Sequence, residues 1–331
     1  MKIFTPLNNG FDIKALSRYA DEYYVGVIDE EWERLYGGFI GYNTRGFSGE
    51  VANFPDWETL SLAGKEVLSC KKEFFLTVNA HNISSSQRPV IKRIISDFKS
   101  IGGNGIICSE LNALEIAKEL GLKAYLSTNF ALYSINSVKY LTENYDVDRI
   151  ILSRDMKMEE IKKIRAATDK EIEVFGQNIA CRFSNALCYC THNTKWRGMC
   201  YSSAVLPLEY FGKLRPLSFR DKYEADINHH IYSKYLFENA CALCALYDCN
   251  KIGIDSIKIV GRELPYERIM QSASVIKYFL EKAECAESRE EYQNILCNEK
   301  DKAGKINCLW GFSCYYPEIA DKRLINGENS L

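Results

Sequence analysis

Short apolar runs alternate with amphipathic stretches along most of this chain, and no other feature limits its folds as strongly. Eight runs rich in β-branched and aromatic residues predict strands. Most of them are apolar at nearly every position, which is typical of parallel strands covered on both faces. The predicted strands are Lys2–Thr5, Tyr23–Val27, Glu73–Asn79, Gly105–Ser109, Lys123–Thr128, Arg149–Ser153, Glu171–Phe175 and Ser256–Val260.

The stretches between these strands show the spacing of amphipathic helices. Parallel strands need crossover helices, and eight of them close into a packed barrel. The sequence therefore predicts an α/β fold, a single (β/α)8 TIM-barrel-like domain. An open doubly wound sheet is the rival architecture. The predicted helices are Ile13–Ala20, Pro89–Phe98, Ala113–Leu120, Ser137–Glu143, Met158–Ala166 and Lys234–Asp248.

Two long connections interrupt the alternation, at residues 28–58 after the second strand and at 178–231 after the seventh. Loops this long in a compact domain usually carry function, and in a barrel both would lie at the carboxyl ends of the strands. We expect residues 1–285 to form the barrel, including a cysteine-rich insertion at 178–231. Residues 286–331 would then form a C-terminal helix and a tail docked on that barrel.

Composition narrows the class of protein. The chain has 331 residues with 42 basic and 44 acidic side chains, so no overall positive field attracts nucleic acid. No apolar stretch is long enough to span a membrane, and the N-terminus lacks the pattern of a signal peptide. We expect a cytoplasmic protein. Its 13 cysteines are unusual there, because disulfides rarely persist in a reducing compartment, and they indicate metal ligation.

The cysteines gather after the seventh predicted strand. Four thiols, Cys181, Cys188, Cys190 and Cys200, fall within twenty residues, and Cys241, Cys244 and Cys249 follow on what we expect to be the next helix. Such thiolates suit an iron–sulfur cluster or zinc, and spacing alone does not separate the two. Three others, Cys70, Cys108 and Cys285, stand in apolar patterns and are expected to be buried core thiols.

These segments resemble the peptidase U-32 family of collagenase-like proteases. The family carries a strand like Glu173-Val174-Phe175, then cysteines that match Cys181, Cys188 and Cys200. A fourth matches Cys241, seventeen residues before the closing strand Lys258–Arg262. Val260 stands where the family has a glutamate, which removes a carboxylate from the mouth of the barrel.

The resemblance implies a 4Fe-4S cluster held by Cys181, Cys188, Cys200 and Cys241, with Cys190, Cys244 or Cys249 as alternatives to a named ligand. It also implies oxygen-independent hydroxylation of an aromatic small molecule or an RNA base, with prephenate as oxygen donor. Two other functions stay open. One is a collagenase-like peptidase, and the other is a non-catalytic, cluster-bearing subunit that pairs with a related protein.

Five polar residues are expected to bind substrate, because they follow the carboxyl ends of predicted strands or stand in the loop above them: Arg45, Asn79, His81, Arg154 and Lys258. Cations at that position suit a carboxylate or a phosphate, and a dicarboxylate such as prephenate would need more than one. The basic, aromatic residues 195–222 would suit RNA, and a solvated loop surface is the alternative, which the slightly acidic overall charge favours. The sequence assigns no catalytic residue.

Overall fold

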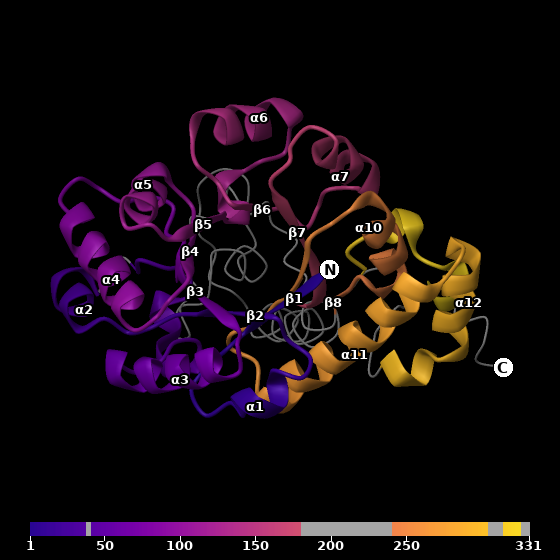
Figure 1. The fold of residues 1–331 in the computed structure, drawn as a ribbon, viewed down its shortest axis with the longest axis horizontal. Coiled ribbons are helices and arrows are strands. Elements are labelled where there is room, and N and C mark those ends of the chain that lie inside the picture. The colour runs from indigo at the N-terminus through magenta and orange to yellow at the C-terminus, as the bar shows by residue number, and fades with distance from the viewer. Residues whose placement is uncertain (38–40, 180–239, 304–313, 326–331) are drawn as a thin grey trace, which may run out of the picture.

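The computed structural model describes residues 1–37, 41–179, 240–303 and 314–325. Eight parallel strands form a closed barrel, and Figure 1 shows them at the centre of a ring of helices. The strands are β1 (Lys2–Pro6), β2 (Glu22–Val25), β3 (Glu73–Val78), β4 (Gly105–Cys108), β5 (Lys123–Leu126), β6 (Arg149–Ile151), β7 (Glu171–Asn178) and β9 (Ser256–Ile259).

The barrel closes through two pairings of β7. This strand pairs in parallel with β6 on one side, where Arg149 lies opposite Glu171, and with β9 on the other, where Phe175 lies opposite Lys258. Strand β9 in turn pairs with β1. The predicted (β/α)8 barrel is therefore confirmed. The alternative of an open doubly wound sheet is wrong, because the pairing of β6 with β7 closes the sheet into a barrel.

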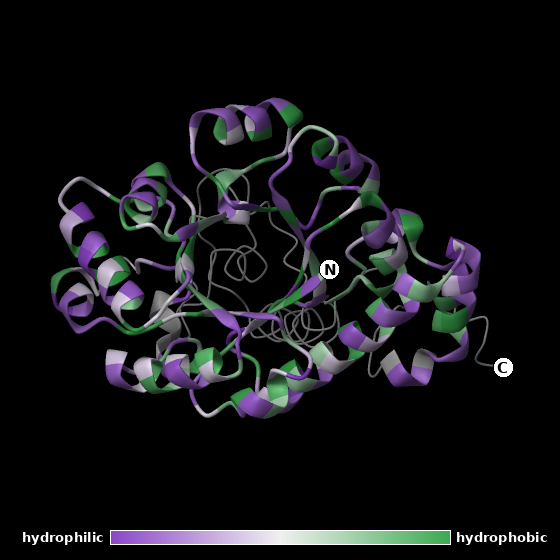
Figure 2. Ribbon diagram, in the orientation of Figure 1, coloured by the Kyte–Doolittle hydropathy of each residue, from purple (hydrophilic) through white to green (hydrophobic). Residues whose placement is uncertain are grey.

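The helices surround the strands, and each mixes hydrophilic with hydrophobic residues (Figure 2). Such amphipathic helices bury one stripe against the sheet and expose the other. They are α1 (Ile13–Leu16), α2 (Glu30–Tyr36), α3 (Trp57–Ser69), α4 (Arg88–Ser100), α5 (Leu111–Glu119), α6 (Ile135–Asn144), α7 (Met158–Arg165), α10 (Leu246–Ile252), α11 (Tyr266–Cys285), α12 (Arg289–Asn298) and α13 (Lys322–Ile325).

Close packing between the layers depends on small residues at some contacts. On α3, a Cβ added at Gly64 would lie 2.8 Å from the Phe74 ring of β3, so glycine allows the helix to approach the strand. The described residues also form five short 3-10 turns: η1 (Gly46–Val51), η2 (Thr128–Phe130), η5 (Leu243–Ala245), η6 (Lys300–Ala303) and η8 (Pro317–Ile319). No described helix is both long and apolar enough to cross a membrane.

The structure differs from the sequence prediction in several elements. Residues 240–245, predicted as part of a helix, form the short strand β8 (Ala240–Cys241) and the turn η5. Strand β8 runs antiparallel to β7, which continues to Asn178, three residues beyond the predicted end. The connection at residues 28–58 contains α2 and η1, and helices α3 and α11 were not predicted. Strand β8 depends on pairing with distant segments, which a local pattern does not encode, whereas α3 carries a local helix signal in its N-cap Asp56 that the prediction overlooked.

The C-terminal segment joins the barrel beside β8. Cys314 forms a parallel β-bridge with Cys241, and the N–H of Tyr315 donates to the Cys241 carbonyl at 3.1 Å. The Tyr315 hydroxyl donates to backbone carbonyls at the end of β7. The division into a barrel and a docked tail stays a prediction, because residues 304–313 and 326–331 lie outside the described part.

Candidate functional site

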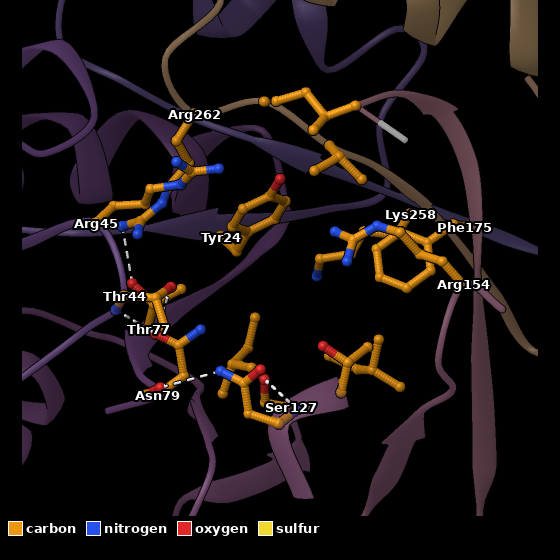
Figure 3. Close-up of a pocket in the computed structure, with 17 residues that line it drawn as sticks. Tyr24, Thr44, Arg45, Thr77, Asn79, Ser127, Arg154, Phe175, Lys258 and Arg262 are labelled. Carbon is orange, nitrogen blue, oxygen red and sulfur yellow. Dashed lines mark hydrogen bonds between the residues drawn. The ribbon is translucent and has the colours of Figure 1, made fainter. Parts of the chain in front are cut away.

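The carboxyl ends of the strands surround a cavity of about 130 Å³ in the mouth of the barrel (Figure 3). Active sites of this fold are built at that end of the strands. The lining combines four cations with neutral polar groups and aromatic rings. Its residues are Tyr24, Thr44, Arg45, Thr77, Asn79, Ile107, Ser127, Thr128, Asn129, Ile151, Arg154, Phe175, Ile179, Lys258, Val260, Gly261 and Arg262.

Four of the five residues predicted to bind substrate line this cavity: Arg45, Asn79, Arg154 and Lys258. The fifth, His81, is half-buried two residues after Asn79 and is absent from the lining. Prediction from the sequence missed Arg262, which follows β9 and completes the set of cations. The sequence held a signal for Arg262, because it ends the segment Lys258–Arg262 and follows the end of strand β9, as Arg154 follows the end of β6.

Lys258 lies on β9 with its ammonium group inside the barrel. Its Nζ is 2.9 Å from Oε1 of Glu173 and 4.1 Å from the ring centroids of both Phe4 and Tyr24. Burial lowers the pKa of Lys258 to about 8, although the Glu173 carboxylate opposes that shift. With that pKa, Lys258 is mostly protonated at neutral pH and loses its charge above about pH 8.

A buried ion network lies next to Lys258. The Arg149 guanidinium is fully buried and contacts Glu22 at 2.6 Å, Glu171 at 2.5 Å and Glu173 at 2.9 Å. Glu173 thus bridges Arg149 and Lys258. Layers of apolar side chains are usual inside such barrels, so this interior is exceptional in its charge. The network fixes Glu173, and through it the ammonium group in the cavity.

The loop that carries Arg45 is held by amide side chains. The Arg45 N–H donates to Oδ1 of Asn43 at 2.8 Å, and Nδ2 of Asn53 donates to the Arg45 carbonyl at 2.9 Å. Oδ1 of Asn79 accepts from the Thr44 N–H at 3.0 Å. Asn79 therefore orders the loop as well as lining the cavity. The Arg45 guanidinium itself lies 3.2 Å from the Glu263 carboxylate.

Cys241 is the one predicted cluster ligand in the described residues. It lies on β8 opposite Gln177 of β7, so a short strand presents it and not the predicted helix. The thiol is buried, with 8% of the residue exposed, and its Sγ accepts the N–H of Leu243 at 3.3 Å. Backbone N–H groups directed at sulfur are a feature of cysteines that ligate iron–sulfur clusters. The contact is of the kind that a ligating thiolate accepts, and the role of Cys241 as a cluster ligand stays a prediction.

The other predicted ligands, Cys181, Cys188 and Cys200, and the alternative Cys190, lie outside the described residues. So do the basic residues 195–222. Within the described ranges, no three potential ligands are close enough together to hold a metal ion.

The remaining predicted cysteines lie in different environments. Cys244 is buried on η5, and Cys249 is fully buried on α10, where burial raises the pKa of its thiol. Cys108 is fully buried in β4, as expected of a core thiol. The same expectation was wrong for Cys285, which is exposed at the end of α11, and Cys70 is only half-buried. Of the two alternatives to a named ligand that the structure describes, Cys249 is thus the more deeply buried and fits a core thiol better than Cys244.

Comparison with known proteins gives the family. The model of peptidase family U32 matches residues 13–323. The 23S rRNA 5-hydroxycytidine C2501 synthase of Escherichia coli is 24% identical over 196 residues, covering 57% of this chain and 28% of that protein. Collagenase of Porphyromonas gingivalis is 24% identical over 209 residues, covering 58% of this chain and 48% of that protein.

A third relative is the tRNA hydroxylation protein P of Escherichia coli, which is 27% identical over 164 residues, covering 47% of this chain and 34% of that protein. The chain spans less than half the length of each of these three relatives. The family match itself extends over almost the whole chain. This protein therefore belongs to peptidase family U32.

Proposed function

We propose that this protein is an iron–sulfur oxidoreductase that hydroxylates an aromatic small molecule or an RNA base without molecular oxygen. Two relatives support the proposal, since their names describe formation of 5-hydroxycytidine in 23S rRNA and hydroxylation of tRNA. We place the protein in the cytoplasm, where its many thiols would stay reduced.

The position of Cys241 carries the proposal. A buried thiol that accepts a backbone N–H lies on a strand paired with β7, and Ile179, which follows β7, lines the cavity. The proposed ligand set is Cys181, Cys188, Cys200 and Cys241, and four thiolates match the four iron corners of a 4Fe-4S cluster. When bound, such a cluster accepts and donates single electrons.

The cavity supplies binding and orientation. Arg45, Arg154 and Lys258 would hold an anionic co-substrate, and prephenate, with two carboxylates, is the oxygen donor that we propose. The rings of Tyr24 and Phe175 form apolar walls suited to a planar group. The cations and the rings alternate around the cavity, because Arg154 lies over the Phe175 ring and Lys258 over the Tyr24 ring, so the cations would hold the anionic groups while the rings exclude water between them.

A peptidase is the second candidate, because one relative carries the name collagenase. A nucleophile–base pair would be required. The described lining of the cavity includes Ser127 and three threonines but no histidine and no cysteine. The hydroxyls there thus lack an imidazole partner from the described residues, and we rank proteolysis below hydroxylation.

Anaerobic purification followed by iron and acid-labile sulfide analysis tests the proposal. We expect about four irons per chain with matching sulfide and a broad visible absorbance. Stoichiometric zinc without sulfide would refute the redox function. A stable complex with a related protein, with turnover only in that complex, would instead identify a subunit of a heteromeric enzyme.

Two matched variants test the ligand assignment. Cys241 and Cys249 are both buried, and among the described residues the Leu243 N–H donates to the sulfur of Cys241, whereas Cys249 is fully enclosed on α10. We expect Cys241→Ser to lose most of the iron and the visible absorbance, whereas Cys249→Ser should keep both. The reverse result would show that Cys249 is the ligand and that Cys241 is not.

A further inference from the structure

Arg262 is a buried cation with only neutral partners. Its side chain is 5% exposed. One guanidinium nitrogen donates to Oγ1 of Thr77 at 2.8 Å and to Oδ1 of Asn53 at 3.4 Å, and the other donates to Oδ1 of Asn43 at 3.1 Å. These acceptors come from β3 and from the loop after β2, so they hold the guanidinium in place without neutralising it.

The carboxylates near the cavity are engaged elsewhere. Glu263 contacts Arg45, and Glu173 is shared by Lys258 and Arg149. Arg262 makes no ion pair with any described residue. Figure 3 shows Arg45 and Arg262 on one side of Tyr24, and Arg154 and Lys258 on the other, so the cations surround the same space.

The backbone leaves room for this arginine. A Cβ added to Gly26, just after β2, would lie 2.1 Å from the nearest guanidinium nitrogen of Arg262 and 2.2 Å from Oδ1 of Asn53. Any larger residue at position 26 would displace the guanidinium or its acceptor. The backbone at Gly26 therefore leaves space for the Arg262 guanidinium, whose charge no described residue neutralises through an ion pair.

Burying such a charge is costly. Burial lowers the pKa of the Arg262 guanidinium to about 10, and the nearby Arg45 acts in the same direction. Buried charges in proteins are usually paired with an opposite charge or used to bind one. The hydrogen-bond acceptors of Arg262 are all neutral, so no described residue supplies that opposite charge through an ion pair.

We infer that the mouth of the barrel is a binding site for a small oxyanion, with Arg262 as its principal counter-charge and Lys258 and Arg154 opposite. The cavity of about 130 Å³ has roughly ten times the space that one water molecule needs, which suits a small organic carboxylate or phosphate. A planar guanidinium binds either group through two parallel hydrogen bonds. This inference deepens the proposed function by naming the principal residue that would bind its anionic co-substrate.

A pair of substitutions at Val260 tests the charge directly. Val260 lines the same cavity as the four cations and its side chain makes none of their hydrogen bonds, so we expect a longer side chain there to alter the charge of the cavity and leave those bonds intact. Val260→Glu adds a carboxylate, and Val260→Gln adds the same shape without charge. Calorimetric titration with malonate and with inorganic phosphate, at constant ionic strength in chloride, measures binding to the purified protein.

We expect the wild type to bind at least one of the two probes, and Val260→Glu to bind it at least tenfold more weakly than Val260→Gln. Arg262→Gln should show a similar loss, whereas Arg165→Gln, which removes an arginine paired with Asp255 at the other end of the barrel, should change affinity less than twofold. Preference for malonate would identify a carboxylate ligand, and preference for phosphate a phosphorylated one.

Equal binding by the two Val260 variants would overturn the inference, as would a wild type that binds neither probe more tightly than chloride. If Arg262→Gln does not fold, the Val260 pair alone decides. The readout is binding and not turnover, so it separates this inference from the proposed function. Anion binding by a protein without iron would support the inference and refute the cluster. A protein that holds iron but binds no anion would support the cluster and refute the inference.

Discussion

At the scale of single residues, two buried cations of this barrel play different roles. Arg149 has three carboxylates within 2.9 Å, so its charge is neutralised inside the protein. Arg262 has only amide and hydroxyl acceptors. Arg149 begins strand β6 and Arg262 follows the end of β9, so the sequence predicts only that they lie at opposite ends of the barrel. Their difference arises from which side chains the other strands bring to them.

Lys258 leads to a prediction about pH. Its pKa in the folded protein is about 8, below the ordinary value of 10.5, so between these values the unfolded chain binds more protons. The contribution of this residue to the free energy of unfolding therefore rises with pH across that window, by about 1–3 kcal/mol. Urea unfolding at pH 8, 9 and 10 should show this rise in the wild type relative to Lys258→Met.

The control is Lys163→Met, which removes an exposed lysine on α7 and should leave the pH dependence of the wild type unchanged. Parallel pH profiles for the wild type and Lys258→Met would mean that the Lys258 ammonium is not penalised by burial. The comparison uses differences between variants because buried tyrosines such as Tyr24 also titrate abnormally.

At the scale of elements, the eight barrel strands could be predicted from the sequence, but the short strand β8 could not. Each barrel strand is a short run of residues that favour β-structure, so all eight were located from the sequence. Strand β8 has the sequence Ala240-Cys241 in an alanine- and leucine-rich stretch that favours a helix. Its strand geometry depends on pairing with β7 and with Cys314, and both partners are more than sixty residues away along the chain.

The candidate site could also be predicted only in part from the sequence. Arg45, Asn79, Arg154 and Lys258 were found because each stands at the carboxyl end of a strand or in the loop above it. The role of Arg262 depends on Asn43, Asn53 and Thr77, which reach it only in the folded barrel. Patterns along the chain locate a site, but they do not show which of its charges are neutralised.

Asn178, at the end of β7, has a backbone conformation that most residues avoid. Its φ is 74°, and its buried amide accepts from Ser272 and Arg268 and donates to the Val260 carbonyl. Asn178→Ala should lower the free energy of unfolding by about 3 kcal/mol, because hydrogen bonds are lost and a left-handed φ becomes more costly.

Asn178→Gly separates these two causes. Glycine also removes the amide but adopts positive φ freely, so this variant should be about 1 kcal/mol more stable than Asn178→Ala. Urea unfolding of both variants checks the difference. An alanine variant as stable as the glycine variant would show that the backbone conformation at position 178 carries no cost.

At the scale of the whole molecule, the C-terminal segment ties separate parts of the barrel together. Its Tyr315 hydroxyl lies 3.1 Å from the Asn178 carbonyl and 2.9 Å from the Ile179 carbonyl, and the Glu318 carboxylate accepts the N–H of Met158 at the start of α7. The end of β7, strand β8 and α7 thus share one partner. We therefore expect this segment to order the rim of the barrel on which Cys241 lies.

Tyr315→Phe tests this arrangement, because it removes the hydroxyl and leaves the ring. We expect the free energy of unfolding to fall by about 1 kcal/mol, since buried carbonyls lose their donor. Hydrogen exchange should show faster exchange at the Ala242 N–H, which bonds to the Gly176 carbonyl, and unchanged exchange in β3 on the opposite side of the barrel. Tyr140→Phe, at a 60% exposed position on α6, should change neither quantity. Uniformly faster exchange would instead mean that the tail stabilises the barrel as one unit, without any special hold on the rim beside the cavity.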